Sequence, residues 1–441
     1  MRISSTMMSN NYLKQLNGTY EQYSKLMEQA DGSKLHRASD NAVGYSKYLR
    51  YQNNQISNEQ YQSNVSTAAS WMKNADAALV NVTDLLQTFK AKVEQGSNST
   101  NNESDMKDIA KELLANVQEQ VADLNTQIGD RFLFAGQKDT TMPFEISADK
   151  MSRGDTFTLD EKQSAFFSGA TSWGDENTTV KQMLKLNGDD GNSYYMNVNT
   201  GDVYTEDFVK NGYKNEDKFD PAKQRVGNIT AITDPPTAYK VSDHFDQYGV
   251  IKTDAGVGTN AKYNVTVDGK QVNLKLSTTK QYIVKYAGDD KYISMVKKNG
   301  GVDKATDTVN ITGQDINGCD LFDVGNDPHS GTARLNQLLY TVAKLDGADY
   351  KWAGEQGMTI ADSAHATVLG AQTKMAARQQ AYNSSSSMLV TQNESITSDI
   401  SDVSSTDVAQ LATKLMEYQT IYSLSLSVGS KILPGTLADY L

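Results

Sequence analysis

The residues best suited to catalysis or metal binding are few and scattered. The 441-residue chain has four histidines, His36, His244, His329 and His365, and one cysteine, Cys319. The histidines lack the spacing of a metal site, and no second ligand type clusters with any of them. A lone cysteine forms neither a disulfide within the chain nor a cysteine-based metal cluster. We therefore predict no catalytic residue, no metal site and no cofactor.

Two glycine-rich loops resemble ligand sites only in part. Residues 256–258 read Gly-Val-Gly, but the third glycine and the following helix of a dinucleotide site are missing. Residues 187–192 resemble the start of a calcium loop, but the glutamate that should end such a loop is absent. We predict a hairpin turn there. The chain also lacks a Gly-x-Ser-x-Gly element and a phosphate-binding lysine loop, which argues against an enzyme.

Charge and hydropathy exclude two classes of partner. The net charge of -12, from 54 acidic and 42 basic side chains, disfavours binding to nucleic acid or to an anionic membrane. No apolar run approaches the roughly 20 residues that span a bilayer. The first ten residues also lack the apolar core of a signal peptide. We expect a chain that is soluble or exported without a cleaved leader.

The distribution of proline indicates where long helices lie. All six prolines are at positions 143, 221, 235, 236, 328 and 434, so residues 1–142 and 329–433 contain none. Proline inside a helix removes a hydrogen bond and clashes with the preceding turn. Both proline-free ends are therefore predicted to be helical.

Apolar residues at steps of three and four predict three helices in the first 142 residues. The first has a stripe from Leu13 to Ala30 and stops at Asp31-Gly32. The second begins near Tyr45, with a stripe of Tyr45, Leu49, Gln52 and Ile56, and continues as a regular seam from Ala68 to Val93. As one helix, residues 41–95 would reach about 80 Å. The third has a stripe from Ala110 to Ile128, with Gly129 as a left-handed stop.

The C-terminal end repeats this pattern. A short helix is predicted from Leu335 to Leu345, followed by a seam over residues 361–403 and a change of register at residues 404–407. A last apolar stripe starts at Val408. Because Gln, Ser and Asn interrupt the long seam, each end should need the other end, or neighbouring copies, to complete its core.

The middle of the chain, from residue 143 to about 326, shows the alternation of β-strands. Residues 263–276 predict a hairpin around Asp268-Gly269, and residues 282–295 predict a second around residues 288–290. The fold class is therefore α+β, with a long helical coiled-coil rod formed by the N- and C-terminal segments and an inserted β-rich domain.

Five domains are expected along the chain. They are an N-terminal assembly helix at 1–40, the N-terminal part of the rod with a closing hairpin at 41–142, the inserted β-rich outer domain at 143–328, the C-terminal part of the rod at 329–403, and a C-terminal assembly helix at 404–441. Chain termini are normally frayed, so apolar stripes at both ends indicate assembly between chains. The predicted assembly interface comprises Leu13, Leu16, Tyr20, Tyr23, Met27, Val408, Leu411, Leu415, Tyr418 and Tyr422.

Several short motifs carry a family resemblance. Residues 1–4 (Met-Arg-Ile-Ser), the elements at 32–34 and 38–40, and residues 437–441 resemble the flagellin superfamily. Residues 129–136, followed by Thr-Met-Pro-Phe at 141–144, are similar to a signature of the hook-associated protein 3 family, the hook–filament junction proteins. The matching motif residues are Arg131, Phe132, Leu133, Phe134, Ala135 and Gly136. Residues 38–44 are closer to the flagellin pattern, which keeps a filament subunit as the alternative.

The resemblance implies a structural protein of the bacterial flagellum that catalyses no reaction. It implies type III export in an unfolded state, secretion to the hook–filament junction, and helical self-assembly into a ring. The implied partners are copies of the chain itself, a neighbouring hook-associated protein, flagellin and a flagellar export chaperone. A less favoured alternative is that the tyrosines and Asp-Gly loops of the insert bind a glycan, or that the insert carries a hydrolase site.

Overall fold

The computed structural model describes residues 5–168, 180, 182–198, 200–215, 220–229, 245–252, 262–293, 308–318 and 331–432. His244, His329, Cys319 and residues 256–258 lie outside these ranges. The chain divides into two compact units, Met1–Thr67 with Asn383–Leu441, and Ala68–Tyr382. Helices α2 (Ala42–Gly96) and α11 (Met358–Ser404) run through both units. The predicted domain boundaries follow composition rather than contacts, and they stay predictions.

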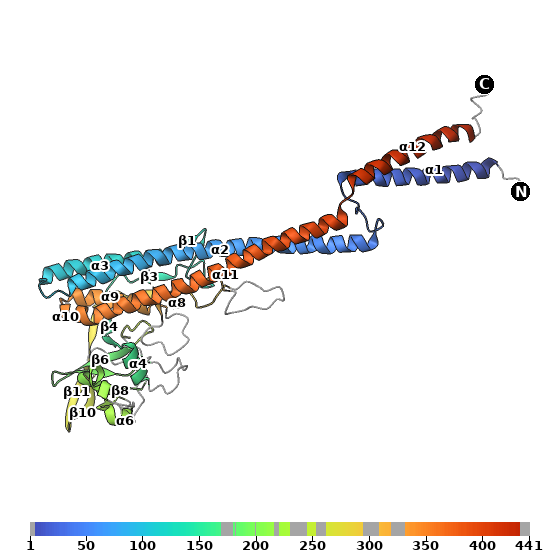
Figure 1. The fold of residues 1–441 in the computed structure, drawn as a ribbon. Helices are drawn as coiled ribbons and strands as arrows, with labels where there is room; N and C mark the ends of the chain where they lie inside the picture. The colour runs from blue at the N-terminus through green and yellow to red at the C-terminus, as the bar shows by residue number, and fades with distance from the viewer. Residues whose placement is uncertain are drawn as a thin grey trace. The chain divides into compact units, whose positions relative to one another are not determined.

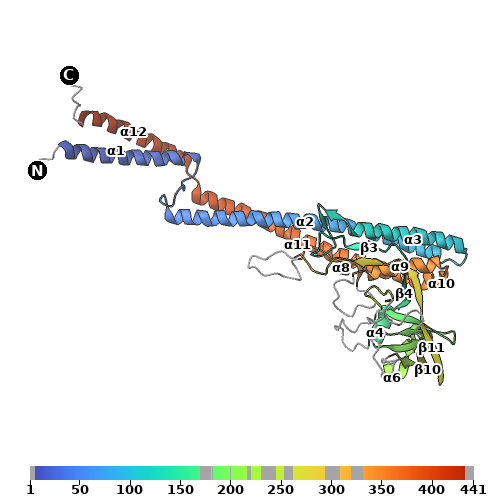
Figure 2. The same ribbon diagram turned by 180° about the vertical axis from the view of Figure 1, so that it is seen from behind.

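The two ends of the chain meet in the first unit. Helix α1 (Ser5–Glu28) lies beside α12 (Val408–Ile432), as Figures 1 and 2 show. A 3₁₀ turn, η1 (Gln29–Asp31), ends α1, and Gly32 follows in the left-handed region with φ 93°. The predicted stop at Asp31-Gly32 is therefore confirmed. Gly32 accepts a backbone hydrogen bond from Thr406 at 3.0 Å, so the two breaks in the helices lie together.

The stripe predicted at Leu49, Gln52 and Ile56 near the start of α2 is wrong by one residue, because the buried face of the helix lies one residue earlier in the sequence. Leu49 is 40% exposed and Ile56 59% exposed, whereas Asn58 is buried and donates to the Gln392 Oε1 at 3.2 Å. Steps of seven residues back from the buried Met72 reach Val65 and Asn58, not Ile56. The inner seam thus includes the polar Asn58, whereas the apolar Leu49 and Ile56 lie outside it.

Four helical segments form the helical core of the second unit. They are the end of α2, α3 (Glu103–Leu124), α9 (Ala333–Asp346) and the start of α11, which follows α10 (Tyr350–Trp352) and a π-helical turn, η4 (Ala353–Gly357). The large apolar side chains that are fully buried in this core include Met72, Leu79, Val82, Leu86, Phe89, Val93, Leu113, Val117, Leu124, Leu335, Leu338, Leu345, Val368 and Met375. The predicted seam from Ala68 to Val93 is confirmed.

Helix α3 ends four residues earlier than predicted. Ile128 belongs to strand β1 (Gln127–Ile128), and Gly129, at φ 64°, lies in the turn to β2 (Arg131–Phe132). The Asn125 side chain exchanges two hydrogen bonds with the backbone of Phe144, at 2.8 and 3.0 Å. This contact stabilises the helix end at Asn125, which no periodic pattern reveals. The predicted closing hairpin is confirmed as the β1–β2 pair.

The insert is built of short antiparallel strands and small helices. Its elements are β3 (Phe144–Ile146), β4 (Met151–Gly154), β5 (Thr156–Thr158), α4 (Glu161–Phe167), β6 (Gln182–Gly188), β7 (Ser193–Met196), β8 (Asp202–Thr205), α5 (Glu206–Lys210), η3 (Gly212–Asn215), α6 (Pro221–Gln224), β9 (Gly227–Asn228), β10 (Lys262–Val267), β11 (Lys270–Leu276), β12 (Thr278–Gln281), β13 (Val284–Tyr286) and α8 (Gly313–Asn317). One sheet has the order β10-β11-β6-β7-β8-β9, with β5 also on β6. Strands β4 and β12 form a separate pair, as do β3 and β13.

One predicted hairpin is confirmed and the other is wrong. Strands β10 and β11 pair around Asp268 and Gly269, both at positive φ. Residues 187–192 also form the predicted turn, between β6 and β7. Strand β13, however, pairs with β3 and not with Tyr292 or Ile293, and residues 294–295 of the predicted hairpin lie outside the described ranges. The Tyr286 hydroxyl donates to the Phe134 carbonyl at 2.9 Å, and this long-range contact favours the observed pairing.

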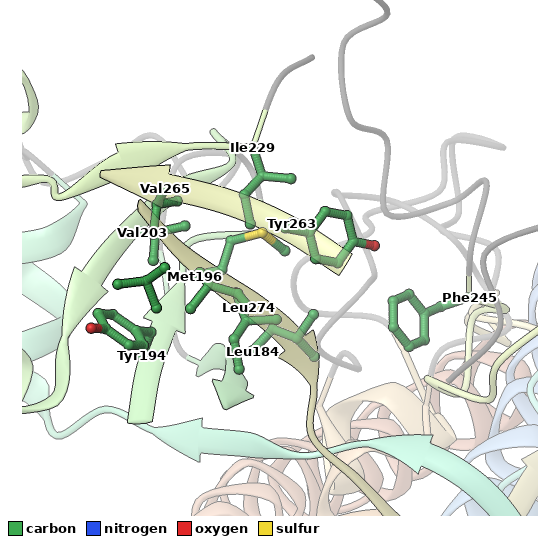
Figure 3. Close-up of a cluster of buried hydrophobic side chains, with 11 residues drawn as sticks. Leu184, Tyr194, Met196, Val203, Ile229, Phe245, Tyr263, Val265 and Leu274 are labelled. Atoms are coloured by element: carbon green, nitrogen blue, oxygen red, sulfur yellow. The ribbon is translucent and has the colours of Figure 1, made fainter. Parts of the chain in front are cut away.

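Most of the described tyrosines of the insert are buried in its cores. One core, drawn in Figure 3, includes Tyr194 and Tyr263 beside Leu184, Met196 and Leu274. A second core includes Tyr195, Tyr204 and Tyr213 packed with phenylalanines. These buried rings are not available to stack on a sugar, so they do not support the hypothesis that the tyrosines of the insert bind a glycan.

Candidate assembly surface

The terminal helices α1 and α12 pack as an antiparallel pair. The Tyr12 hydroxyl donates to the Ser425 carbonyl at 2.6 Å. The rings of Tyr20 and Tyr422 lie 5.8 Å apart, at an interplanar angle of 43°. Moving from Tyr12 to Tyr20 along α1 thus corresponds to moving back from Ser425 to Tyr422 along α12, so the two helices run in opposite directions.

A glycine permits the close approach of the two helices. Gly429 lies inside α12, and a Cβ atom at this position would come within 2.0 Å of the Tyr12 Oη. Gly429 is buried, although glycine inside a helix costs about 1 kcal/mol relative to alanine. The contact with Tyr12 gives a physical reason for a glycine here.

The predicted interface residues fall into two groups. Six are buried or half-buried in the helix pair, namely Leu16, Tyr23, Leu411, Leu415, Tyr418 and Tyr422. The other four are exposed: Leu13 by 42%, Tyr20 by 55%, Met27 by 52% and Val408 by 69%. The first group serves pairing within the chain, and only the second group is available to another molecule without rearrangement.

Sequence analysis missed further exposed apolar residues on the same two helices. They are Met7, Met8, Met416, Ile421, Leu424, Leu426 and Val428, each between 39% and 64% exposed. Met8, Ile421, Leu424 and Val428 line one hollow between the two helices, and an exposed apolar surface of this kind marks an interaction site. These residues are visible in the sequence as apolar positions beside the main stripe of each helix. A prediction that follows only one stripe per helix leaves them out.

The family motif at residues 131–136 forms a buried corner of the second unit. Phe132, Leu133, Phe134 and Ala135 are all buried, whereas Arg131 is exposed and pairs with Asp139 at 3.4 Å. The Asp289 backbone N–H donates to the Ala135 carbonyl at 3.0 Å, and Asp289 Oδ1 accepts from the Gln137 backbone at 2.6 Å. The motif thus joins the helical core to the loop after β13.

Gly136 allows this corner to close. It has φ 71°, and a Cβ atom there would lie 2.2 Å from the carbonyl oxygen of Asp289. Side chains other than glycine are strained at this φ, and backbone atoms cannot move aside cheaply. The last glycine of the motif is therefore required by both conformation and space.

A buried arginine links the helical core to the insert. The Arg334 guanidinium donates to Gln120 Oε1 at 2.7 Å and to Asn317 Oδ1 at 3.0 Å. Burial lowers the pKa of Arg334 to about 9, because the charged form loses hydration. Asn336 is also fully buried and exchanges hydrogen bonds with the backbone of Val284. The base of the insert is therefore continuous with helix α9.

The remaining candidate groups do not form a reactive site in the described part of the chain. Across residues 5–168, 180–229, 245–293, 308–318 and 331–432, less the gaps named above, no three His, Cys, Asp or Glu side chains gather where they could hold a metal ion. His36 lies 3.3 Å from Asp31, and His365 is half-buried on α11. Within the helices that the structure describes, none combines the length and apolarity needed to cross a bilayer.

Paired terminal helices, a helical core and a β-rich insert define a class of flagellin-like α+β fold. Residues 3–139 match the family model described as the bacterial flagellin N-terminal helical region. This match confirms the resemblance to the flagellin superfamily over these residues.

Two curated relatives are flagellins. The chain is 26% identical to a flagellin of Salmonella montevideo over 302 residues, which cover 59% of this chain and 58% of the relative. It is 25% identical to a flagellin of Salmonella moscow with the same coverage. The chain thus spans somewhat more than half the length of these relatives.

Solved structures with a low overall likeness include hook-associated proteins. A flagellar hook-associated protein of Vibrio parahaemolyticus has a TM-score of 0.40 and 15% identity, covering 83% of this chain and 100% of its own. The flagellar junction protein FlgL from Legionella pneumophila has a TM-score of 0.34 and 13% identity, covering 76% and 98%.

Proposed function

We propose that this chain is a structural subunit of the bacterial flagellum that joins the hook to the filament by helical self-assembly. The observation that carries the proposal is a flagellin N-terminal helical region whose first helix pairs with the last helix of the chain and leaves apolar flanks exposed. Burying those flanks against neighbouring subunits would stabilise the assembly by about 25 cal/mol per Å² of apolar surface. The role is mechanical and involves no catalysed reaction.

The proposed partners follow from this role. Copies of the chain form a ring, with a neighbouring hook-associated protein on one side and flagellin on the other. An export chaperone covers the exposed residues of α1 and α12 before secretion, because such a surface would otherwise aggregate. The protein acts outside the cell, at the hook–filament junction.

A filament subunit is the second candidate. The matches to flagellins and the flagellin-like residues 38–44 favour it. The segment 129–136 favours the junction, because it is similar to the hook-associated protein 3 signature and its apolar residues form the buried corner beside Asp289. The junction is therefore our first choice.

Immunogold electron microscopy of isolated flagella distinguishes the two candidates. An epitope inserted at the exposed turn of Asp268 and Gly269, between β10 and β11, should not disturb the helices. A junction subunit predicts gold at one narrow band where the filament meets the hook. Gold along the whole filament would instead identify a flagellin, and flagella without gold would refute both candidates. The matched control is the untagged strain.

A further inference from the structure

A lysine of helix α9 and an aspartate of the insert form a buried ion pair. Lys344 Nζ lies 3.7 Å from Asp155 Oδ2, and the two side chains are only 16% and 4% exposed. The ion pair between Lys150 and Asp346 in the same unit differs, because both of its side chains are 41% exposed. Moving two charges out of water costs free energy, which their attraction offsets in full only when the geometry of the pair is excellent.

Backbone contacts and one hydroxyl hold Asp155 in place. Asp155 follows β4, and its backbone donates to the Ser277 carbonyl at 2.8 Å and accepts from the Lys185 N–H at 2.7 Å. The Ser277 hydroxyl donates to Asp155 Oδ2 at 2.6 Å. The other carboxylate oxygen, Oδ1, is buried and accepts no hydrogen bond from any residue that the structure describes. One oxygen of the carboxylate is therefore fixed, and the other has no partner there.

Two aromatic rings confine the lysine beside this carboxylate. The Lys344 ammonium lies 5.3 Å from the centroid of the Tyr340 ring and 5.9 Å from that of the Trp352 ring. The two rings pack edge to face, with their centroids 4.9 Å apart, so they restrict a side chain that is otherwise flexible. Burial, together with the charge of Asp155, raises the pKa of Tyr340 well above its usual range. The Tyr340 hydroxyl therefore keeps its proton near the carboxylate.

The distance between the two groups favours a reaction over a strong hydrogen bond. Charge-assisted hydrogen bonds join nitrogen and oxygen at about 2.7–2.9 Å. The 3.7 Å between Lys344 Nζ and Asp155 Oδ2 instead leaves the nitrogen beside the carboxylate, where its lone pair can turn to the carboxyl carbon once a proton is lost. Groups held in a well-oriented contact react as if at an effective concentration of about 10⁵ M or more.

We propose that Lys344 and Asp155 form an isopeptide bond once the chain has folded. Proton transfer from the ammonium to the carboxylate gives a neutral amine and a carboxylic acid, which removes both buried charges. The amine lone pair then attacks the carboxyl carbon, and Oδ1 leaves as water with two protons that come from the nitrogen. The Tyr340 hydroxyl can pass one of these protons. Oδ2 becomes the amide oxygen and keeps its hydrogen bond from Ser277. The reaction releases one water and needs no oxidant and no co-reactant.

Such a bond joins the base of the insert covalently to the helical core. It closes a loop between residues 155 and 344, which restricts the unfolded chain as a disulfide would. The chain has a single cysteine and therefore forms no disulfide of its own. The bond depends on the fold, because the two residues are far apart in the sequence and meet only in the folded unit. The inference does not rest on the proposed function, since it concerns one chain alone.

Tryptic peptide mapping of the full-length chain tests the bond, after circular dichroism has shown that the chain is folded. Trypsin releases residues 154–162, which contain Asp155, and residues 335–344, which end at Lys344. Trypsin does not cleave after an acylated lysine. The bond therefore predicts one joined species, residues 154–162 with residues 335–351, lighter by one water than the sum of its two peptides. Fragmentation in the mass spectrometer locates the linked residues.

Two variants serve as matched controls. Lys344→Arg keeps the positive charge and the trypsin site but cannot form the amide, so both peptides should appear separately. Asp155→Ala should also give separate peptides, which excludes a link through Asp160 or Glu161 in the same peptide. Full recovery of separate peptides from the folded, unaltered chain would show an ion pair only and overturn the inference. A joined peptide in Asp155→Ala would overturn it as well. Neither result bears on filament attachment, which tests the proposed function.

Discussion

At the scale of single residues, the close approach of Gly136 to Asp289 sets a strict constraint on the second unit. Gly136→Ala places a Cβ atom 2.2 Å from a backbone oxygen at φ 71°. We expect a loss of about 3 kcal/mol in the free energy of unfolding, from left-handed strain and overpacking together. Urea denaturation measures it. Gly129→Ala is the control, because Gly129 also has a positive φ, 64°, but a Cβ atom there would meet no atom within 4 Å. We expect this variant to lose about 1 kcal/mol in the free energy of unfolding, from left-handed strain alone. Equal losses in the two variants would contradict the account.

The residue scale also shows what sequence can and cannot predict at the candidate surface. Heptad spacing identified Leu16, Tyr23 and Leu411, which are buried or half-buried in the helix pair, because packing on one helix face leaves a periodic signal. Ile421 and Val428 were missed, since one apolar stripe was sought on each helix and these two residues lie beside it. Only the hollow between α1 and α12 shows that they lie together.

At the scale of elements, a glycine controls the packing of α1 on α12. Gly429→Ala would clash with the Tyr12 ring and weaken its hydrogen bond to Ser425. We expect a net loss of about 1 kcal/mol, because overpacking outweighs the gain in helix propensity. Amide hydrogen exchange of α12 in the full chain should become faster.

Gly18 on α1 provides the matched control. A Cβ atom at Gly18 meets nothing within 4 Å, so Gly18→Ala should slow exchange in α1 by stabilising the helix by up to about 1 kcal/mol. Slower exchange in both variants would mean that Tyr12 does not pack on Gly429.

Elements with strong local signals were predicted, and those set by distant contacts were not. The long helix α2 and the β10–β11 hairpin follow from periodicity and from an Asp-Gly turn. The end of α3 depends on Asn125 bonding the Phe144 backbone, and the partner of β13 depends on Tyr286 reaching Phe134. Neither contact leaves a pattern within a short window of sequence.

At the scale of the whole molecule, the insert has a base joined to the helical core and an outer part with cores of its own. Arg334 and Asn336 of α9 bond to Asn317 and Val284 at the base. Deleting residues 145–326 would remove the Val284 partner of Asn336 and the Asn317 partner of Arg334, which keeps only Gln120, at a cost of about 3 kcal/mol or more. The helical core of such a chain should fail to fold cooperatively.

A shorter deletion should be tolerated better. The Asp155 backbone N–H donates to the Ser277 carbonyl at 2.8 Å, so a two-residue Asn-Gly turn can replace residues 156–276 and keep β4 paired with β12. We expect cooperative helical unfolding in this variant, followed by circular dichroism. Cooperative unfolding after the longer deletion as well would show that the base contacts are dispensable.

The central claim is that the paired ends of the chain join hook to filament. Filament attachment in a deletion strain tests it most directly, with complementation by the full chain or by a chain that lacks residues 408–441. Loss of α12 removes the partner of α1 and the exposed apolar residues that α12 contributes to the pair. Export into the medium and the thermal unfolding of the truncated chain serve as controls. We predict attached filaments with the full chain, and bare hooks with an exported truncated chain whose second unit still unfolds near the same temperature. Attached filaments with the truncated chain would contradict the account.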